Sequence, residues 1–291
     1  MGSRYGGLKQ TDAIGPHGEA IIDYSVYDTI RAGFGKVVFV IRKNFAGNFI
    51  RNFQTKLAGK IAVEFVFQEL DKLPFQADIP VQRKKPLGTA HAVWVAHQVI
   101  DKPFAVINAD DFYGKESFKI MAQYLTETVT KNPNYFAMIG YQLQNTLSGY
   151  GYVSRGICQI DKNDLLQSVV EKTHIEKKEG KIIAEENEQK EIFTGNEIVS
   201  MNFWGFSPAL FPYLEEGLKD FMIRHPNDLE SEFYLPSVVN RLINQRKVKV
   251  KVLKTPEKWF GITYKKDKKS AVSHIQNLIQ QGIYPENLWN L

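Results

Sequence analysis

Residues 103–112 read PFAVINADDF, an apolar run that ends in two adjacent carboxylates, Asp110 and Asp111. A short apolar run of this length predicts a buried strand. Ligands bind at the carboxyl ends of strands in open α/β sheets, and one or two carboxylates together with substrate phosphates commonly hold Mg²⁺. We therefore predict that Asp110 and Asp111 are magnesium ligands, the alternative being a solvated turn after the strand.

Helical and strand patterns alternate on both sides of this run. Further strands are predicted at 36–43, 60–70 and 134–142, and helices at 19–33, 45–58, 88–100 and 115–129. Such alternation predicts an α/β fold, a Rossmann-like, mostly parallel sheet with helices on both faces. A doubly wound unit normally opens with a strand, and none precedes the glycine-rich segment at the start of this sequence.

The second half has a different pattern, that of a mixed α+β region. Antiparallel strands are predicted at 150–157 and 164–172, a hairpin centred on Glu179-Gly180, strands at 197–207 and 247–254, and helices at 208–225, 235–245 and 270–282. We place a soft boundary near residue 145, which divides the chain into regions 1–145 and 146–291.

Composition restricts the class of protein. The chain has 291 residues, of which 43% are hydrophobic and 24% charged, as in a globular protein of one large or two ordinary domains. No apolar run approaches the ~20 residues of a membrane helix, and MGSRYGGLKQ has no signal-peptide pattern. The single cysteine, Cys158, fits a reducing cytoplasm. The net charge of +5 is interpreted first as an ordinary solvated surface. Binding of anionic small molecules is the second interpretation, and binding of nucleic acid is the third.

The segment GSRYGGLKQ at 2–10 combines glycines with two cations, Arg4 and Lys9. Successive backbone amides in such a loop can cradle phosphates, and the cations suit a triphosphate. The spacing matches neither the Walker pattern nor G-x-G-x-x-G, so a flexible start is the alternative.

A second loop, PLGTAHA at 86–92, enters a predicted helix. Thr89 either caps that helix or belongs to a loop whose backbone reads a base edge. Gln82, shortly before Gly88, offers a donor and an acceptor for the same task.

Two polar features mark the second half. Glu171 and Lys172 follow an apolar run, which is typical of a surface pair but also suits recognition of a polyhydroxyl ligand. Asn202 lies inside an aromatic-rich strand, where a buried amide must find partners, a ligand being one of them.

In this order the pieces resemble the sugar-1-phosphate nucleotidyltransferase family, the NDP-sugar pyrophosphorylases. The matching pieces are G-S-R and L-K-Q within 2–10, P-L-G-T-A at 86–90, the strand ending in Asp110-Asp111, Y-G at 150–151, V-V-E-K at 169–172, and the asparagine-containing strand at 200–206. The resemblance implies that a nucleoside triphosphate and a sugar 1-phosphate react to give an NDP-sugar and pyrophosphate, without a covalent enzyme intermediate. It implies magnesium as the cofactor.

The resemblance also implies a role for each matching residue. The triphosphate and its leaving pyrophosphate would be held by Gly2, Arg4 and Lys9, and the base by Gln82, Gly88 and Thr89. Asp110, with Asp111 beside it, would bind the metal. The sugar would contact Gly151, Glu171 and Asn202, and Lys172 would contact the sugar phosphate. Region 1–145 would thus bind the nucleotide and region 146–291 the sugar phosphate.

Two departures from the family pattern leave alternatives open. The family's first strand and the start of its phosphate loop are not in this sequence, so we expect residues upstream of Met1 that form them. The family often has a second metal carboxylate in a stretch W-x-D-x-G, and in this sequence Gly261 or a neighbour stands at that place. The alternatives are a non-catalytic nucleotide-sugar-binding regulatory protein and a cytidylyltransferase that acts on a phosphorylated alcohol such as phosphocholine.

Overall fold

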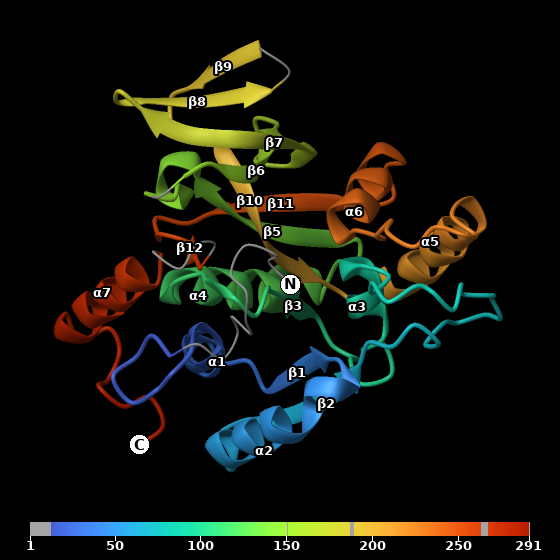
Figure 1. The fold of residues 1–291 in the computed structure, drawn as a ribbon, viewed down its shortest axis with the longest axis horizontal. Helices are drawn as coiled ribbons and strands as arrows, with labels where there is room; N and C mark the ends of the chain where they lie inside the picture. Colours follow the sequence, from blue (N-terminus) through green and yellow to red (C-terminus); the bar gives the residue numbers. More distant parts are fainter. Residues whose placement is uncertain (1–12, 150, 187–188, 263–266, 291) are drawn as a thin grey trace.

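A mixed β-sheet runs through the centre of the molecule, with helices packed on it (Figure 1). The computed structural model describes residues 13–149, 151–186, 189–262 and 267–290. The strands are β1 (Lys36–Ile41), β2 (Ala62–Phe67), β3 (Phe104–Val106), β4 (Asp111–Phe112), β5 (Tyr135–Gln142), β6 (Val153–Ile160), β7 (Leu166–Lys178), β8 (Lys181–Glu186), β9 (Gln189–Phe193), β10 (Ile198–Phe206), β11 (Lys249–Lys254) and β12 (Phe260–Gly261).

The helices lie largely where apolar spacing predicts them. They are α1 (Ile21–Arg31), α2 (Ala46–Leu57), α3 (Thr89–Trp94), α4 (Lys115–Tyr124), α5 (Leu210–Arg224), α6 (Leu235–Asn244) and α7 (Asp267–Gln280). Helix α3 is shorter than its predicted range of 88–100. A ring nitrogen of His97 lies 3.0 Å from the carbonyl oxygen of Trp94, so the His97 side chain contacts a backbone acceptor at the end of this helix.

The main sheet has the strand order β11-β5-β10-β6-β7-β8-β9, and β3 pairs with β10 on the edge opposite β5. Strands β11 and β5 are parallel, whereas the other neighbours in this sheet are antiparallel. The parallel pair β1–β2 and the antiparallel pair β4–β12 form two small separate sheets.

The α/β class is confirmed, but parallel pairing is less extensive than expected. It is found between β1 and β2 and between β11 and β5, whereas β3 and β5, which run in the same direction, are separated by the antiparallel strand β10. Strands β10 and β11 come from beyond residue 145 and pair with strands from before it. The hydrogen-bonded sheet therefore crosses the predicted boundary.

Two apolar clusters account for most of the core. Strand β5 contributes to both, because Phe136 and Met138 belong to one cluster and Ala137 and Ile139 to the other. This alternation follows from the two-residue period of a strand. Helices α3, α5 and α6 pack into the first cluster and α4 into the second.

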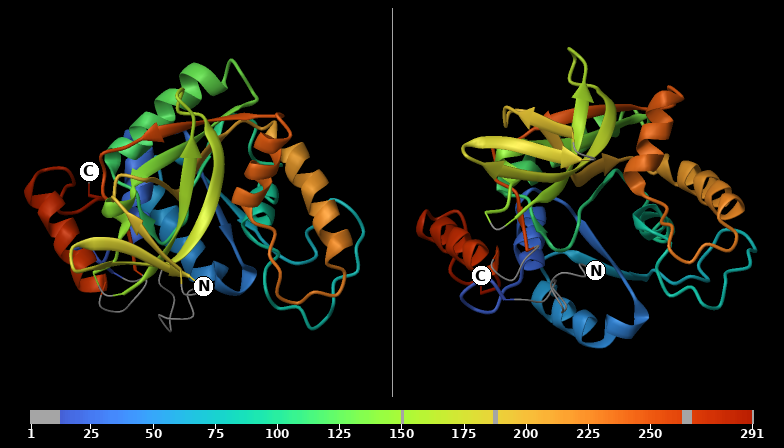
Figure 2. Two further views of the ribbon diagram at one scale, coloured as in Figure 1. Left: turned by 90° about the horizontal axis from the view of Figure 1, so that it is seen from above. Right: turned by 45° about the horizontal axis from the view of Figure 1, so that its top comes forward.

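Strands β7, β8 and β9 extend the sheet away from α1 and α2 (Figure 1). Both views in Figure 2 place α7 and the α5–α6 pair on opposite sides of these strands. The turn between β7 and β8 is at Glu179-Gly180, as the sequence predicts, and both residues have positive φ angles, of 50° and 80°. Among the described residues, no helix is long and apolar enough to cross a membrane.

Candidate active site

A cavity of about 260 Å³ lies among residues of β4, β6, β7 and β10. The side chains that bear on its chemistry are Asn108, Asp111, Arg155, Glu171, Asn202 and Trp259. Asp111, Glu171 and Asn202 thus line the same cavity, although Asp111 and Asn202 are 91 residues apart in the sequence. Asn108, Arg155 and Trp259 are additions that the sequence analysis missed.

Asp111 is the buried acid of this cavity, with 9% of its surface exposed. Its Oδ2 accepts a hydrogen bond from Asn108 Nδ2 at 2.9 Å and lies 3.3 Å from the hydroxyl of Tyr113. Burial, followed by the charge of Asp110, raises the pKa of Asp111 to about 7, against the opposing effects of Asn108, Arg155 and Tyr113. A group that can bind or release a proton near neutrality is therefore fixed at the end of the apolar run.

Gly261 lies directly opposite Asp111 in the β4–β12 pair. A Cβ atom at position 261 would be 2.8 Å from Asp111 Oδ1 and 2.9 Å from the Trp259 ring. A side chain there would have to displace the carboxylate, because real Cβ contacts are not this short. The absence of a side chain at position 261 thus leaves the space that the Asp111 carboxylate occupies.

Asn202 has a left-handed backbone conformation, with φ of 59°, inside β10. The pairing of β10 with β5 shifts register between Ser200 and Trp204, so Asn202 lies in a bulge. Asparagine tolerates this conformation better than most residues, but it remains an unusual one for a strand. Such local strain is typical of functional positions and is consistent with the ligand interpretation of this amide.

Glu171 and Lys172 are adjacent in β7 but differ in their surroundings. Glu171 lines the cavity, where desolvation raises the pKa of its carboxyl group and Arg155 lowers it. Lys172 forms an ion pair with Glu191 of β9, with Nζ and Oε2 2.7 Å apart. Lys172 does not line the cavity in the described part of the chain.

Arg155 is buried, with 8% of its surface exposed, and its guanidinium is held by neutral groups. Nε donates to Thr146 Oγ1 at 3.1 Å, Nη1 donates to the carbonyl oxygen of Ser154 at 2.7 Å, and Nη2 donates to the carbonyl oxygen of Thr146. The guanidinium carbon is 4.6 Å from the centroid of the Trp259 ring. Burial lowers the pKa of Arg155 to about 10, while Asp111 and Glu171 raise it.

The loop before α3 makes close contact with the segment before α6. Gly88 has φ of 110° and ψ of −179°, and a Cβ atom there would be 2.6 Å from the carbonyl oxygen of Phe233. The amide of Phe233 donates to the carbonyl of Leu87 at 2.7 Å. The hydroxyl of Thr89 accepts a hydrogen bond from the amide of Leu235 at 3.0 Å, so it caps α6 and not its own helix.

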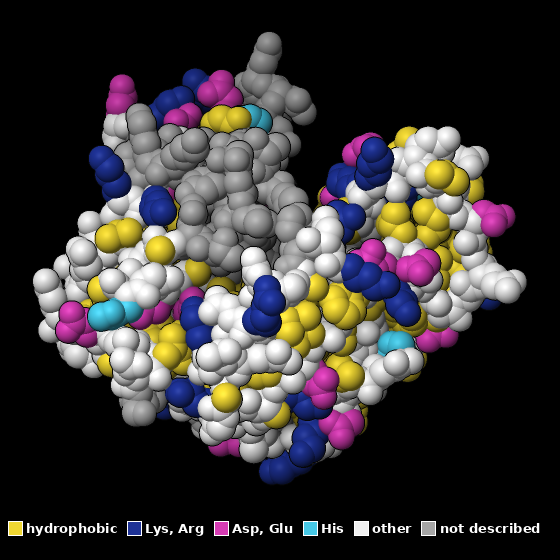
Figure 3. Space-filling view, turned by 60° about the horizontal axis from the view of Figure 1, so that its bottom comes forward, with side chains coloured by type: hydrophobic (Ala, Val, Ile, Leu, Met, Phe, Trp, Pro, Cys, Tyr) yellow, Lys and Arg dark blue, Asp and Glu magenta, His cyan; other side chains and the backbone are white. Residues whose placement is uncertain are grey.

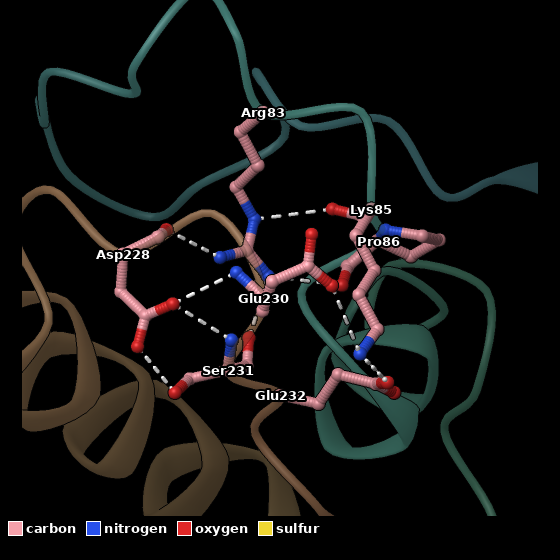
Figure 4. A network of polar contacts seen from close by, with 7 residues as sticks. All are labelled: Arg83, Lys85, Pro86, Asp228, Glu230, Ser231 and Glu232. Carbon is pink, nitrogen blue, oxygen red and sulfur yellow. Dashed lines mark hydrogen bonds and ion pairs between the residues drawn. The ribbon is translucent and has the colours of Figure 1, made fainter.

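Arg83 forms hydrogen bonds with both of these segments (Figure 4). Its guanidinium donates to four carbonyl oxygens, those of Lys85, Pro86, Asp228 and Ser231. Lys85 adds an ion pair to Glu232, with Nζ and Oε1 2.9 Å apart. The preceding residue, Gln82, is exposed. The network therefore holds the loop that carries Gln82, Gly88 and Thr89.

The remaining predicted residues are placed as follows. Gly2, Arg4 and Lys9 lie outside the described residues. Asp110 and Gly151 are described and partly buried, but neither lines the cavity of about 260 Å³. On the face drawn in Figure 3, the Lys and Arg side chains of the described residues lie among Asp and Glu side chains.

The residues suited to a metal ion are the adjacent carboxylates of Asp110 and Asp111. In the described ranges, no group of three or more His, Cys, Asp or Glu side chains could hold a metal ion by itself. Mg²⁺ is commonly bound by one or two carboxylates plus substrate phosphates, so a two-carboxylate site fits that ion. Burial and then repulsion from Asp110 raise the pKa of Asp111, and a cation here would offset that repulsion.

Comparison with known proteins identifies the family of the chain. A model of the family described as nucleotidyl transferase matches residues 9–262. No curated protein sequence matches the chain closely enough to count as a relative.

Among the solved structures that resemble the chain are the following three, each covering 92% of it. A putative glucose-1-phosphate thymidylyltransferase from Bacillus anthracis, in complex with a sucrose, is 12% identical, with 92% of this chain and 87% of that chain covered and a TM-score of 0.59. An apo UDP-glucose pyrophosphorylase is 14% identical, with 92% and 90% covered and a TM-score of 0.54. HddC from Yersinia pseudotuberculosis is 15% identical, with 92% and 89% covered and a TM-score of 0.53. At identities this low, the structural likeness shows that the fold is shared and nothing more.

Proposed function

Because the chain belongs to the nucleotidyl transferase family, we propose that it joins a nucleoside triphosphate to a sugar 1-phosphate, giving an NDP-sugar and pyrophosphate. The observation that carries this proposal is the meeting of Asp111, Glu171 and Asn202 in one cavity. The printed names of two of the similar structures, a glucose-1-phosphate thymidylyltransferase and a UDP-glucose pyrophosphorylase, point to the same reaction class.

The cavity suits the sugar part of such an acceptor. Carboxylates and amides recognise hydroxyl groups, since they accept and donate hydrogen bonds in fixed directions. Glu171 and Asn202 supply one of each kind from neighbouring parts of the sheet. Gly151 would lie along the sugar, as the resemblance implies.

The reaction is a phosphoryl-centred substitution. A phosphate oxygen of the sugar 1-phosphate attacks the α-phosphorus of the triphosphate, the bond from this phosphorus to the β-phosphate's bridging oxygen breaks, and pyrophosphate leaves. Both substrates are anionic, so positioning and charge neutralisation supply the catalysis. By the resemblance, Gly2, Arg4 and Lys9 hold the triphosphate and stabilise the leaving pyrophosphate, and Lys172 contacts the sugar phosphate.

Asp110 and Asp111 are the proposed magnesium ligands. When bound there, the ion would neutralise phosphate charge and favour the ionised form of Asp111. The Asp111 carboxylate is held in place by its hydrogen bond from Asn108, in the space left by Gly261.

Gln82, Gly88 and Thr89 are the proposed contacts of the base. Support comes from the Arg83 network, which holds their loop against the segment before α6. Backbone amides and carbonyls fixed in this way could read the hydrogen-bonding edge of a base.

The test is a matrix of nucleoside triphosphates against sugar 1-phosphates with Mg²⁺, read by pyrophosphate release and by mass spectrometry of the product. We expect one nucleotide and one sugar phosphate to give an NDP-sugar. Turnover of CTP with phosphocholine, and of no sugar phosphate, would establish the cytidylyltransferase alternative. Thermal stabilisation by an NDP-sugar without turnover of any pair would establish the non-catalytic alternative, because a ligand that binds the native state raises its melting temperature.

A further inference from the structure

We propose that Arg155 binds the phosphate group of the acceptor substrate. The inference rests on the proposed function for the identity of the acceptor as a phosphate monoester. Neither the sequence pattern nor the family resemblance assigns a role to this residue.

Charge is the first reason. Among the described residues that line the cavity, Arg155 is the only Lys or Arg. It is 8% exposed, and its three hydrogen bonds go to a hydroxyl and two backbone carbonyls, not to a carboxylate. Burying a cation is costly in free energy. The charges of Asp111 and Glu171 offset part of this cost, and an anion bound directly to the guanidinium would offset more of it.

Donor capacity is the second reason. A guanidinium has five N–H donors, whereas the described residues accept three hydrogen bonds from Arg155. Each Nη carries a second N–H beyond the one used for Ser154 or Thr146. Two N–H groups in one plane match two oxygens of a phosphate, which is the arrangement for which arginine is especially suited.

Orientation is the third reason. The guanidinium carbon is 4.6 Å from the centroid of the Trp259 ring, so the side chain is packed on an aromatic partner. Thr146, which is fully buried, holds Nε and Nη2 and is itself fixed through a hydrogen bond from Oγ1 to the carbonyl of Leu143 at 2.9 Å. The fork is therefore preorganised, which reduces the entropy that would be lost when an anion binds.

The position of Lys172 is the fourth reason. Its Nζ forms an ion pair with Glu191, 2.7 Å from Oε2, and its side chain is not among those that line the described cavity. To contact a phosphate there it would have to exchange this ion pair. Arg155 faces the cavity without such a rearrangement.

The test compares Arg155→Met and Arg155→Lys with the wild type by isothermal titration calorimetry. The probes are inorganic phosphate and glucose 1-phosphate, with glucose as the uncharged comparison. A hydrogen bond to a charged group contributes roughly 1.5–3 kcal/mol, which corresponds to a loss in phosphate affinity of about tenfold or more. We expect that loss in both variants, since lysine lacks the planar fork, and no comparable loss for glucose.

Arg224→Lys is the matched control, because Arg224 is an exposed arginine of α5 in an ion pair with Asp220. Melting temperatures show whether each variant folds. If Arg155→Met does not fold, the phosphate affinity of Arg155→Lys alone decides the test. Unchanged phosphate affinity in a folded Arg155→Lys protein overturns the inference. So does a loss for Arg155→Lys that is no larger than the loss for the control Arg224→Lys. If the wild type binds phosphate through Arg155 but makes no NDP-sugar, the proposed function fails and the binding role of Arg155 stands.

Discussion

Replacing Gly88 by alanine should destabilise the protein far more than the same change at Gly59. Both glycines have positive φ angles, 110° and 73°. A Cβ atom at position 59 would meet nothing within 4 Å, whereas one at position 88 would lie 2.6 Å from the carbonyl oxygen and 2.7 Å from the amide nitrogen of Phe233. Comparing the two variants therefore separates the effect of backbone strain on stability from the effect of steric conflict.

The expected magnitudes follow from these two contributions. Alanine at position 59 should cost about 1 kcal/mol, the penalty for a left-handed residue with a Cβ. At position 88 the backbone region is accessible essentially to glycine alone, which costs about 1–3 kcal/mol, and the conflict with Phe233 adds about 1–3 kcal/mol. Backbone atoms cannot rotate away, so the hydrogen bonds from Phe233 to Leu87 and from Ala90 to Phe233 would be lost or lengthened.

Urea unfolding of the two variants and the wild type, followed by tryptophan fluorescence and far-UV circular dichroism, measures the difference. We expect Gly88→Ala to lose at least about 2 kcal/mol more than Gly59→Ala. Equal losses would show that the contact between Gly88 and Phe233 does not constrain this loop. A nucleotide titration of folded Gly88→Ala protein then asks whether the base-binding role proposed for the loop depends on that contact.

Three further predictions concern the cavity and its carboxylates. Asp110→Asn should slow turnover by roughly 10²–10³ with little change in melting temperature, because one electrostatic group is removed; near wild-type pyrophosphate release would exclude its role. Glu171→Ala should weaken sugar phosphate binding and leave nucleotide affinity unchanged, and calorimetry with each ligand alone checks this division. The pKa of Asp111 is raised to about 7 in the folded protein from a usual value of 3.8, so its contribution to stability is complete below about pH 4 and is lost as the pH rises through 7. The melting temperature without Mg²⁺ should therefore fall more between pH 5 and pH 8 in the wild type than in Asp111→Asn, and parallel curves would contradict the assignment.

Local pattern alone located nearly all the helices and strands. The β-branched run at 36–43, the helical spacing of 19–33 and the hairpin at Glu179-Gly180 each depend on residues close together in the chain. Periodicity reports which side chains share a face of one element, so it does not depend on the rest of the fold. The ordered series of motifs also indicated the nucleotidyl transferase family, which the match over residues 9–262 confirms.

Strand pairing required the tertiary structure. The run at 197–207 predicts a strand, but its alternation does not say which strands lie beside it. Strand β10 in fact runs antiparallel between β3 and β5, so the sheet is less parallel than the alternation of helices and strands suggests. Pairing depends on contacts between residues far apart in sequence, and on these the local period carries no information.

The residues of the cavity likewise divide into those that the sequence indicates and one that only the tertiary structure reveals. Asp111, Glu171 and Asn202 could be selected from the sequence because a carboxylate at a strand end, or an amide inside an apolar strand, is conspicuous among its neighbours. Arg155 gives no such signal, since an arginine in an amphipathic strand is ordinarily a solvated residue. It becomes a candidate ligand-binding group only because Thr146 and Trp259, nine residues before and 104 residues after it, bury its guanidinium beside the cavity. The sequence by itself determined which residues carry charge, and the long-range packing decided which charge is removed from water and left facing the cavity.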